Sequence, residues 1–125
     1  MRLLLDTHVF LWAAVAHASL NSKARNAIAT AEAVYVSAAT IWEIAIKAQL
    51  GKIDADPDAL VAAIDQSGFI ALPVQAKHAA GVTRLLPLHK DPFDRLLIAQ
   101  AIAEPLRLLT ADATLVPYSE LVTLV

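Results

Sequence analysis

The sequence predicts an α/β domain in which a parallel sheet is covered by helices on both faces. Short apolar runs, long enough only for buried strands, alternate along the chain with stretches whose apolar residues recur every three or four positions. Strands that alternate with helices in this way usually pair in parallel and are buried on both faces. The 125 residues suit one domain, 1–125, with one hydrophobic core.

Five segments have the length and composition of buried strands, with four or five residues each. Apolar side chains fill these runs almost without interruption, as expected where helices cover both faces of a sheet. Pro73 ends the third segment because proline has no N–H group to donate to a neighbouring strand. The predicted strands are Arg2–Asp6, Val34–Ser37, Phe69–Leu72, Leu106–Thr110 and Leu121–Val125.

Capping residues, prolines and glycines bound the helices between these strands. Ser, Asn and Asp side chains cap the free N–H groups of a first turn, Pro is tolerated at the first helical position, and Gly often follows the last turn. A first helix is expected to start at Thr7. Four further helices are predicted at Lys23–Ala31, from Ala38 to Leu50, from Pro57 to near Gly68, and from Pro92 to about Glu104.

The overall composition narrows the possible functions. Hydrophobic residues make up 58% of the chain, yet the longest stretch without Asp, Glu, Lys or Arg, Thr7–Ser22, is too short and too polar to span a bilayer. We therefore expect a cytoplasmic protein without membrane association, part of whose apolar surface is covered by another chain. The chain has no Cys, which excludes disulfides and thiolate metal sites. Its net charge of −2 means that nucleic-acid binding would depend on a local site.

Four acidic residues stand where the surrounding sequence is apolar or where an element ends. Asp6 and Asp112 follow predicted strands, at the sheet edge where open parallel sheets bind ligands. Glu43 is the only charge in the apolar stretch 38–46, and Asp94 lies in the first turn of its helix. Carboxylates gathered at one edge would repel one another unless a cation shares the site. Such oxygen ligands favour Mg²⁺ or Mn²⁺, which promote phosphodiester hydrolysis.

Each acid also has a purely structural interpretation. Glu43 could form an ion pair with Lys47 at the i+4 position, and the charge of Asp94 would interact favourably with the dipole of its helix. Capping of the following helical segment would account for three acids, namely Asp6, Asp91 and Asp112. The segment after Asp112 would be Ala113–Val116. The order and context of the acids nevertheless favour a shared site.

Four motifs, in the order in which they occur here, resemble those of one protein family. The Asp-Thr pair lies in Leu4–His8, a Trp-Glu pair in Ser37–Lys47, an Asp-Pro-Phe-Asp sequence in His89–Ala101, and a closing Thr-Ala-Asp sequence in Leu109–Asp112. Together these segments resemble the PIN-domain family, and in particular the VapC toxins of bacterial toxin–antitoxin pairs. The third motif is the most specific, and the resemblance extends over nearly the whole chain.

The resemblance implies a three-layer PIN-like fold with a central parallel sheet of about five strands flanked by helices, and an acidic pocket at its carboxyl edge. It also implies a metal-dependent endoribonuclease toxin that uses Mg²⁺ or Mn²⁺, hydrolyses RNA, and is inhibited by a VapB-like antitoxin. We further expect a homodimer. Carried over residue by residue, the catalytic and metal-binding acids are Asp6, Glu43, Asp94 and Asp112. The supporting residues are Thr7, Asp91 and Thr110.

We assign roles outside the acidic site to several other residues. Phosphate contacts near the pocket could come from His89, Lys90 and Arg95, although Arg95 could instead pair with Asp91 at i+4. Trp12 and Trp42 are assigned to the core or to an interface and not to base stacking. The segments that could form a dimer face or an antitoxin groove, or belong to the core, are Val9–Val15 and Val61–Ile64.

Two other functions compete with the ribonuclease hypothesis. The first is a non-catalytic PIN-like binding module, in which the acids serve only the structure. The second is phosphoryl transfer through Asp6, which would need an acid at the position of His8 or a pair of acids before Asp6, and also a lysine late in the chain. No lysine follows Lys90, so this second alternative is weak.

Overall fold

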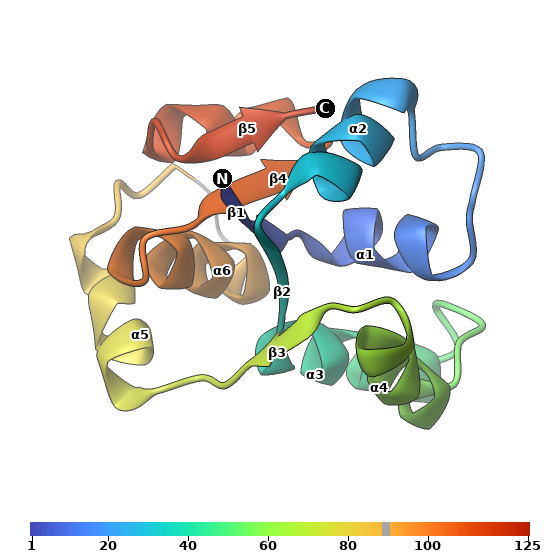
Figure 1. The fold of residues 1–125 in the computed structure, drawn as a ribbon. Helices are drawn as coiled ribbons and strands as arrows, with labels where there is room; N and C mark the ends of the chain where they lie inside the picture. The colour runs from blue at the N-terminus through green and yellow to red at the C-terminus, as the bar shows by residue number, and fades with distance from the viewer. Residues whose placement is uncertain (89–90) are drawn as a thin grey trace.

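A five-stranded sheet, all of it parallel, forms the centre of the computed structural model, which describes residues 1–88 and 91–125 (Figure 1). The strand order is β3-β2-β1-β4-β5. The strands are β1 (Arg2–Leu5), β2 (Ala33–Ser37), β3 (Ile70–Leu72), β4 (Arg107–Thr110) and β5 (Val122–Leu124). The predicted α/β fold with a parallel sheet of about five strands is confirmed, and each predicted strand is present.

Helices connect the strands, and those predicted from the sequence are present with ends shifted by a few residues. They are α1 (Thr7–Ala14), α2 (Ser22–Thr30), α3 (Ala38–Gln49), α4 (Pro57–Gln66), α5 (Ala76–Gly81), α6 (Pro92–Ala103) and the 3-10 helices η1 (Val82–Arg84) and η2 (Ala113–Tyr118). The sequence did not single out α5 and η1, because both are too short to show a clear helical period. No helix in the described part of the chain is long and apolar enough to cross a membrane.

The side chains of β1 alternate between two hydrophobic cores, one on each face of the sheet. Leu3 and Leu5 belong to the core formed with α1, α2, α3 and α4, whereas Leu4 belongs to the core formed with α6 and η2. All three leucines are fully buried. Figure 1 shows α5 and α6 on one side of the sheet and α1, α2 and α4 on the other. The result is a three-layer arrangement that excludes water from the sheet.

The strand register brings the carboxyl ends of β1, β2 and β4 to one edge of the sheet. Leu3 lies beside Val34 of β2, and Leu5 lies beside Leu109 of β4. The backbone N–H of Asp6 donates to the carbonyl of Leu109 at 3.0 Å, so pairing continues one residue beyond β1. At this edge α1 follows β1, α3 follows β2 and η2 follows β4. The helix α6 packs against α3, which brings a fourth element to the same region.

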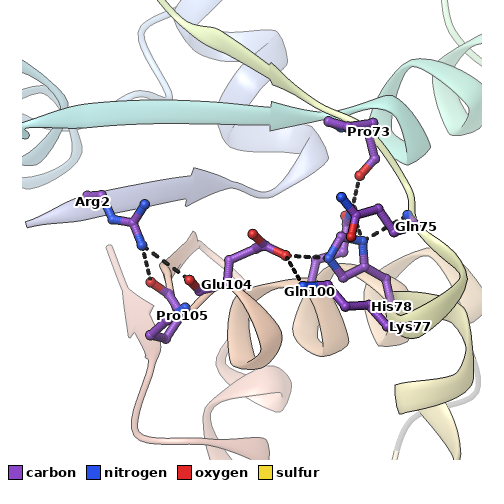
Figure 2. A network of polar contacts seen from close by, with 8 residues as sticks. All are labelled: Arg2, Pro73, Gln75, Lys77, His78, Gln100, Glu104 and Pro105. Atoms are coloured by element: carbon purple, nitrogen blue, oxygen red, sulfur yellow. Dashed lines mark hydrogen bonds and ion pairs between the residues drawn. The ribbon is translucent and has the colours of Figure 1, made fainter.

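A buried polar network joins α5 to α6 (Figure 2). His78 is fully buried, and its Nδ1 accepts the backbone N–H of Gln75 at 3.0 Å. The ring proton therefore lies on Nε2, which donates to Glu104 Oε2 at 2.6 Å. Gln100, also fully buried, donates from Nε2 to the Pro73 carbonyl at 3.3 Å. The hydrogen bond from His78, with help from Lys77, holds the pKa of Glu104 below its usual value. No pattern in the sequence distinguished His78 from the other histidines.

Replacing His78 should destabilise the fold much more than replacing its neighbour Lys77. His78→Leu leaves the Gln75 N–H and the Glu104 carboxylate without their partner, so we expect a loss of about 1–3 kcal/mol in the free energy of unfolding. Lys77 makes only a 3.6 Å ion pair to Glu104 from a largely exposed position, so Lys77→Ala should cost no more than about 0.5 kcal/mol. Urea denaturation measures both values, and equal losses would contradict the structural role given to the His78 network.

Candidate active site

The ends of β1 and β4 are joined through the side chain of Thr110. Its hydroxyl donates to Asp6 Oδ2 at 2.5 Å and accepts the backbone N–H of Asp112 at 3.0 Å. The other carboxylate oxygen of Asp6 accepts the backbone N–H of His8 at 2.8 Å. Thr110 is fully buried and Asp6 is only 5% exposed. Asp6 is therefore held as an oriented carboxylate, and Thr110 ties it to the turn that carries Asp112.

A second group of contacts joins α1 to α3. The hydroxyl of Thr7, the first residue of α1, donates to Glu43 Oε1 at 2.7 Å. The second oxygen of Glu43, Oε2, lies 2.5 Å from Lys47 Nζ. Glu43 is 3% exposed, so this carboxylate is buried with a hydroxyl on one oxygen and an ammonium group on the other. Two supporting residues, Thr7 and Thr110, thus orient two of the predicted acids.

The pKa of Asp94 responds to the charges of the acids around it. Burial raises its pKa, and the negative charges of four other acids add to the effect, so that the pKa reaches about 7. In decreasing order of effect these acids are Asp91, Asp6, Glu43 and Asp112. The other three acids proposed from the sequence, together with Asp91, therefore all lie near enough to Asp94 for their charges to act on it.

The structural roles considered for these acids are also present. Asp6 caps α1, Asp112 caps η2 by accepting the backbone N–H of Thr114 at 2.9 Å, and Asp91 caps α6 by accepting the N–H groups of Phe93 at 2.8 Å and of Asp94 at 3.2 Å. The expected i+4 ion pair between Glu43 and Lys47 is formed as well. Asp6, Asp91 and Asp112 therefore cap helical segments and also contribute to the raised pKa of Asp94. A structural role for these acids does not exclude a shared site.

The chemistry of the donors fits a hard divalent cation. Carboxylate and hydroxyl oxygens are the ligands preferred by Mg²⁺ and Mn²⁺, and the raised pKa of Asp94 shows a local excess of negative charge that a cation would relieve. Within residues 1–88 and 91–125, no three His, Asp or Glu side chains are arranged to hold a metal ion as they stand. The acid oxygens instead contact hydroxyls, backbone amides and Lys47.

Two hollows lie beside the acids. One, of about 400 Å³, is lined by Asp6, His8, Trp12, Ala111, Asp112 and Ala113. The other, also about 400 Å³, is apolar and includes Trp42 and Phe93, the residues next to Glu43 and Asp94. Their rings meet edge to face with centroids 5.2 Å apart. Trp42 is 60% exposed, which excludes the core for this residue and leaves the interface, the other position expected for it, as a prediction.

The remaining residues singled out in the sequence differ in their burial and contacts, and two of them lie outside the described residues. Arg95 donates to the carbonyls of Val82 at 3.2 Å and Leu86 at 2.9 Å, and so holds the segment that precedes α6. The phosphate contacts expected of His89 and Lys90 lie outside the described residues. In the two segments considered for an interface, the buried members are Val9, Phe10 and Ile64, and the exposed members are Val15, Val61 and Ala62.

Comparison with known proteins agrees with this architecture. The sequence profile of the PIN domain family matches residues 3–120 of the chain. The crystal structure of VapBC2 from Rickettsia felis bound to a DNA fragment from their promoter contains a chain that superposes with a TM-score of 0.69 and 17% identity, covering 99% of this chain and 97% of that chain. For FitAcB from Neisseria gonorrhoeae the TM-score is 0.61 with 21% identity, covering 90% and 89%. None of the curated protein sequences matches this chain.

Removing the Thr110 hydroxyl should uncouple the ends of β1 and β4. Thr110→Val keeps the side-chain shape but leaves the Asp6 carboxylate and the Asp112 N–H without the buried hydroxyl, so we expect the free energy of unfolding to fall by about 1.5–3 kcal/mol. Thr110→Ser retains the hydroxyl and should recover most of this stability. Chemical denaturation of the three proteins tests the interaction, and equal stability of the Val and Ser variants would refute it.

Removing the charge of Asp94 should stabilise the protein at alkaline pH when no divalent ion is added. With its pKa raised to about 7 in the folded protein and about 3.9 in an unfolded chain, Asp94 binds its proton more tightly when folded. Its destabilising effect is therefore complete above pH 7, shrinks as the pH falls from 7 to about 4, and disappears below. We expect Asp94→Asn to raise the free energy of unfolding by about 1–3 kcal/mol at pH 8 and by almost nothing at pH 4.

The matched control for this experiment is Asp54→Asn, which removes a charge from an exposed residue that does not line the acidic hollow. Its effect on stability should be small at every pH. Urea denaturation in EDTA between pH 4 and pH 8 measures both variants. A gain for Asp94→Asn that does not change with pH would show that repulsion among the acids is not its cause.

Proposed function

Because this chain belongs to the PIN-domain family, we propose that it is a metal-dependent endoribonuclease that hydrolyses RNA phosphodiester bonds and acts as the toxin of a toxin–antitoxin pair. One observation carries the proposal. Burial raises the pKa of Asp94, and the charges of Asp91, Asp6, Glu43 and Asp112 raise it further, an effect that depends on their proximity at the carboxyl edge of the sheet. Acids brought so close are costly for a structural protein and useful for one that binds a divalent cation.

In this proposal Asp6, Glu43, Asp94 and Asp112 would hold Mg²⁺ or Mn²⁺. The bound ion would supply a more acidic water and would neutralise charge on the scissile phosphate. The chain's own part is to orient the acids. Thr110 and Thr7 fix Asp6 and Glu43 through their hydroxyls. Asp91 caps α6 and so fixes the first turn that carries Asp94.

RNA binding would depend on this pocket because the chain as a whole is not basic, with a net charge of −2. A divalent ion would convert the repulsive acidic edge into one that attracts phosphate. The hollow beside Asp6 and Asp112 offers space for a strand to approach these acids. A homodimer would enlarge this surface by placing two such pockets in one groove.

A cytoplasmic VapB-like antitoxin is proposed as the partner. The VapBC2 structure from Rickettsia felis, bound to a DNA fragment from their promoter, resembles this chain in fold over nearly its whole length. Several large apolar side chains are exposed here and would suit coverage by the antitoxin or by a second copy of the chain. They include Val15, Trp42, Leu50, Val61, Leu86 and Leu88.

Cleavage of RNA in the presence of Mg²⁺ or Mn²⁺ tests the proposed activity. We expect the wild-type protein to cleave and EDTA to abolish cleavage. Glu43→Gln and Asp94→Asn keep the shapes of the side chains but remove their charges, and each should lower the rate by about 100-fold or more. Asp54→Asn, which changes an exposed acid outside the site, should cleave like the wild type.

Two results would reject the ribonuclease proposal. The first is equal cleavage by wild type, Glu43→Gln and Asp94→Asn, which would indicate a contaminating nuclease. The second is a folded wild-type protein that neither cleaves RNA nor gains thermal stability with Mg²⁺ or Mn²⁺ beyond the effect of salt. That result would favour the non-catalytic binding module considered from the sequence.

A further inference from the structure

Lys47 has an unusual environment for a lysine in an i+4 ion pair. Its Nζ lies 2.5 Å from Glu43 Oε2, and the Glu43 side chain is only 4% exposed while the Lys47 side chain is 34% exposed. By contrast, the ion pair between Lys77 and Glu104 spans 3.6 Å, with side-chain exposures of 60% and 25%. Lys47 therefore extends from the protein surface to a buried carboxylate, that of Glu43.

The charges around Lys47 come from two helices. Glu43 belongs to α3, as Lys47 does, and the charges of Asp91 and Asp94 on α6 also favour the charged form of the lysine. Asp94 and Glu43 are two of the four acids proposed to hold the divalent ion. The ammonium group of Lys47 thus neutralises part of the same negative charge that the ion would neutralise.

The two oxygens of Glu43 are not equivalent. Oε1 accepts the Thr7 hydroxyl, and Thr7 is buried at the start of α1 with a fixed position. Oε2 contacts Lys47, whose long side chain can move to solvent because a third of it is exposed. A cation approaching Glu43 would therefore displace the lysine more readily than the threonine, since two positive groups on the same oxygen repel each other whereas a neutral hydroxyl is not repelled.

We propose that Lys47 is a tethered cation that competes with the divalent ion for Glu43 and so sets the ion concentration at which the site is filled. The inference rests on the proposed metal-dependent function and adds a regulatory element to it. At low divalent-ion concentration the lysine keeps the buried Glu43 carboxylate paired. At higher concentration the ion replaces it, and the two binding events weaken each other reciprocally.

Metal affinity of the full-length chain tests this competition, with Lys47→Met compared with wild type and with Lys52→Met. Lys52 is exposed and follows α3, so its replacement removes a positive charge without touching Glu43. We expect Lys47→Met to melt at a lower temperature than wild type in EDTA, to bind Mg²⁺ at least about fivefold more tightly, and to gain more melting temperature when Mg²⁺ is added. Lys52→Met should behave like the wild type in all three respects.

An unchanged or weaker affinity of Lys47→Met for Mg²⁺ would overturn the proposal, because Lys47 would then support the metal-binding form of Glu43 instead of opposing it. If Lys47→Met does not fold, NMR of the lysine side chains in the wild-type protein provides the test. The Nζ signal of Lys47, assigned by its loss in Lys47→Arg, should move toward that of a solvent-exposed lysine as Mg²⁺ is added. The signal of Lys52 should stay in place.

The same measurements separate this inference from the proposed function. A wild-type protein that binds Mg²⁺ while the Lys47 signal and the affinity of Lys47→Met remain unchanged would refute competition and leave the metal centre intact. A wild-type protein with no Mg²⁺ response in melting temperature or in NMR would refute both.

Discussion

Repulsion among carboxylates at one edge of a parallel sheet is the constraint around which this molecule is organised. The strand register places Asp6 beside the end of β4, and the helices that follow the strands add Glu43 and Asp94. Asp6 and Glu43 are compensated by hydroxyls, a backbone N–H and one lysine. For Asp94, burial and neighbouring charges outweigh the available compensation and raise its pKa to about 7. The pKa of Asp94 therefore reflects its burial and the charges of the acids around it.

The rest of the fold holds the helix that carries Asp94. At its first turns α6 is fixed by the Asp91 cap and by Arg95, which reaches the carbonyls of the segment before the helix. At its other end Glu104 receives the hydrogen bond of the buried His78 (Figure 2). Between these ends Leu97 and Ile98 pack fully buried against the sheet. A helix fixed in this way cannot retreat from the other acids to relieve their repulsion.

The sequence predicted the elements that depend on local signals and missed those that depend on tertiary contact. The strands follow from continuous apolar runs, and α6 follows from its Asp-Pro start. The i+4 spacing predicted the ion pair of Glu43 with Lys47, but not that the Glu43 side chain is buried while that of Lys47 stays partly exposed. His78 gave no signal because its partners lie up to 26 positions away in the chain. For Trp42 the sequence left a core and an interface position open, since an apolar helix does not reveal which side faces solvent, and its exposure excludes the core.

The overlap between capping and the acidic site has a physical reason. A carboxylate at the carboxyl end of a parallel strand stands directly before the next helix, where free N–H groups and the helix dipole favour negative charge. Asp6 and Asp91 gain this stabilisation from α1 and α6. Capping thus lowers the cost of placing these negative charges close together. Asp94 lies within the first turn of α6, where burial and then the charges of the neighbouring acids raise its pKa to about 7.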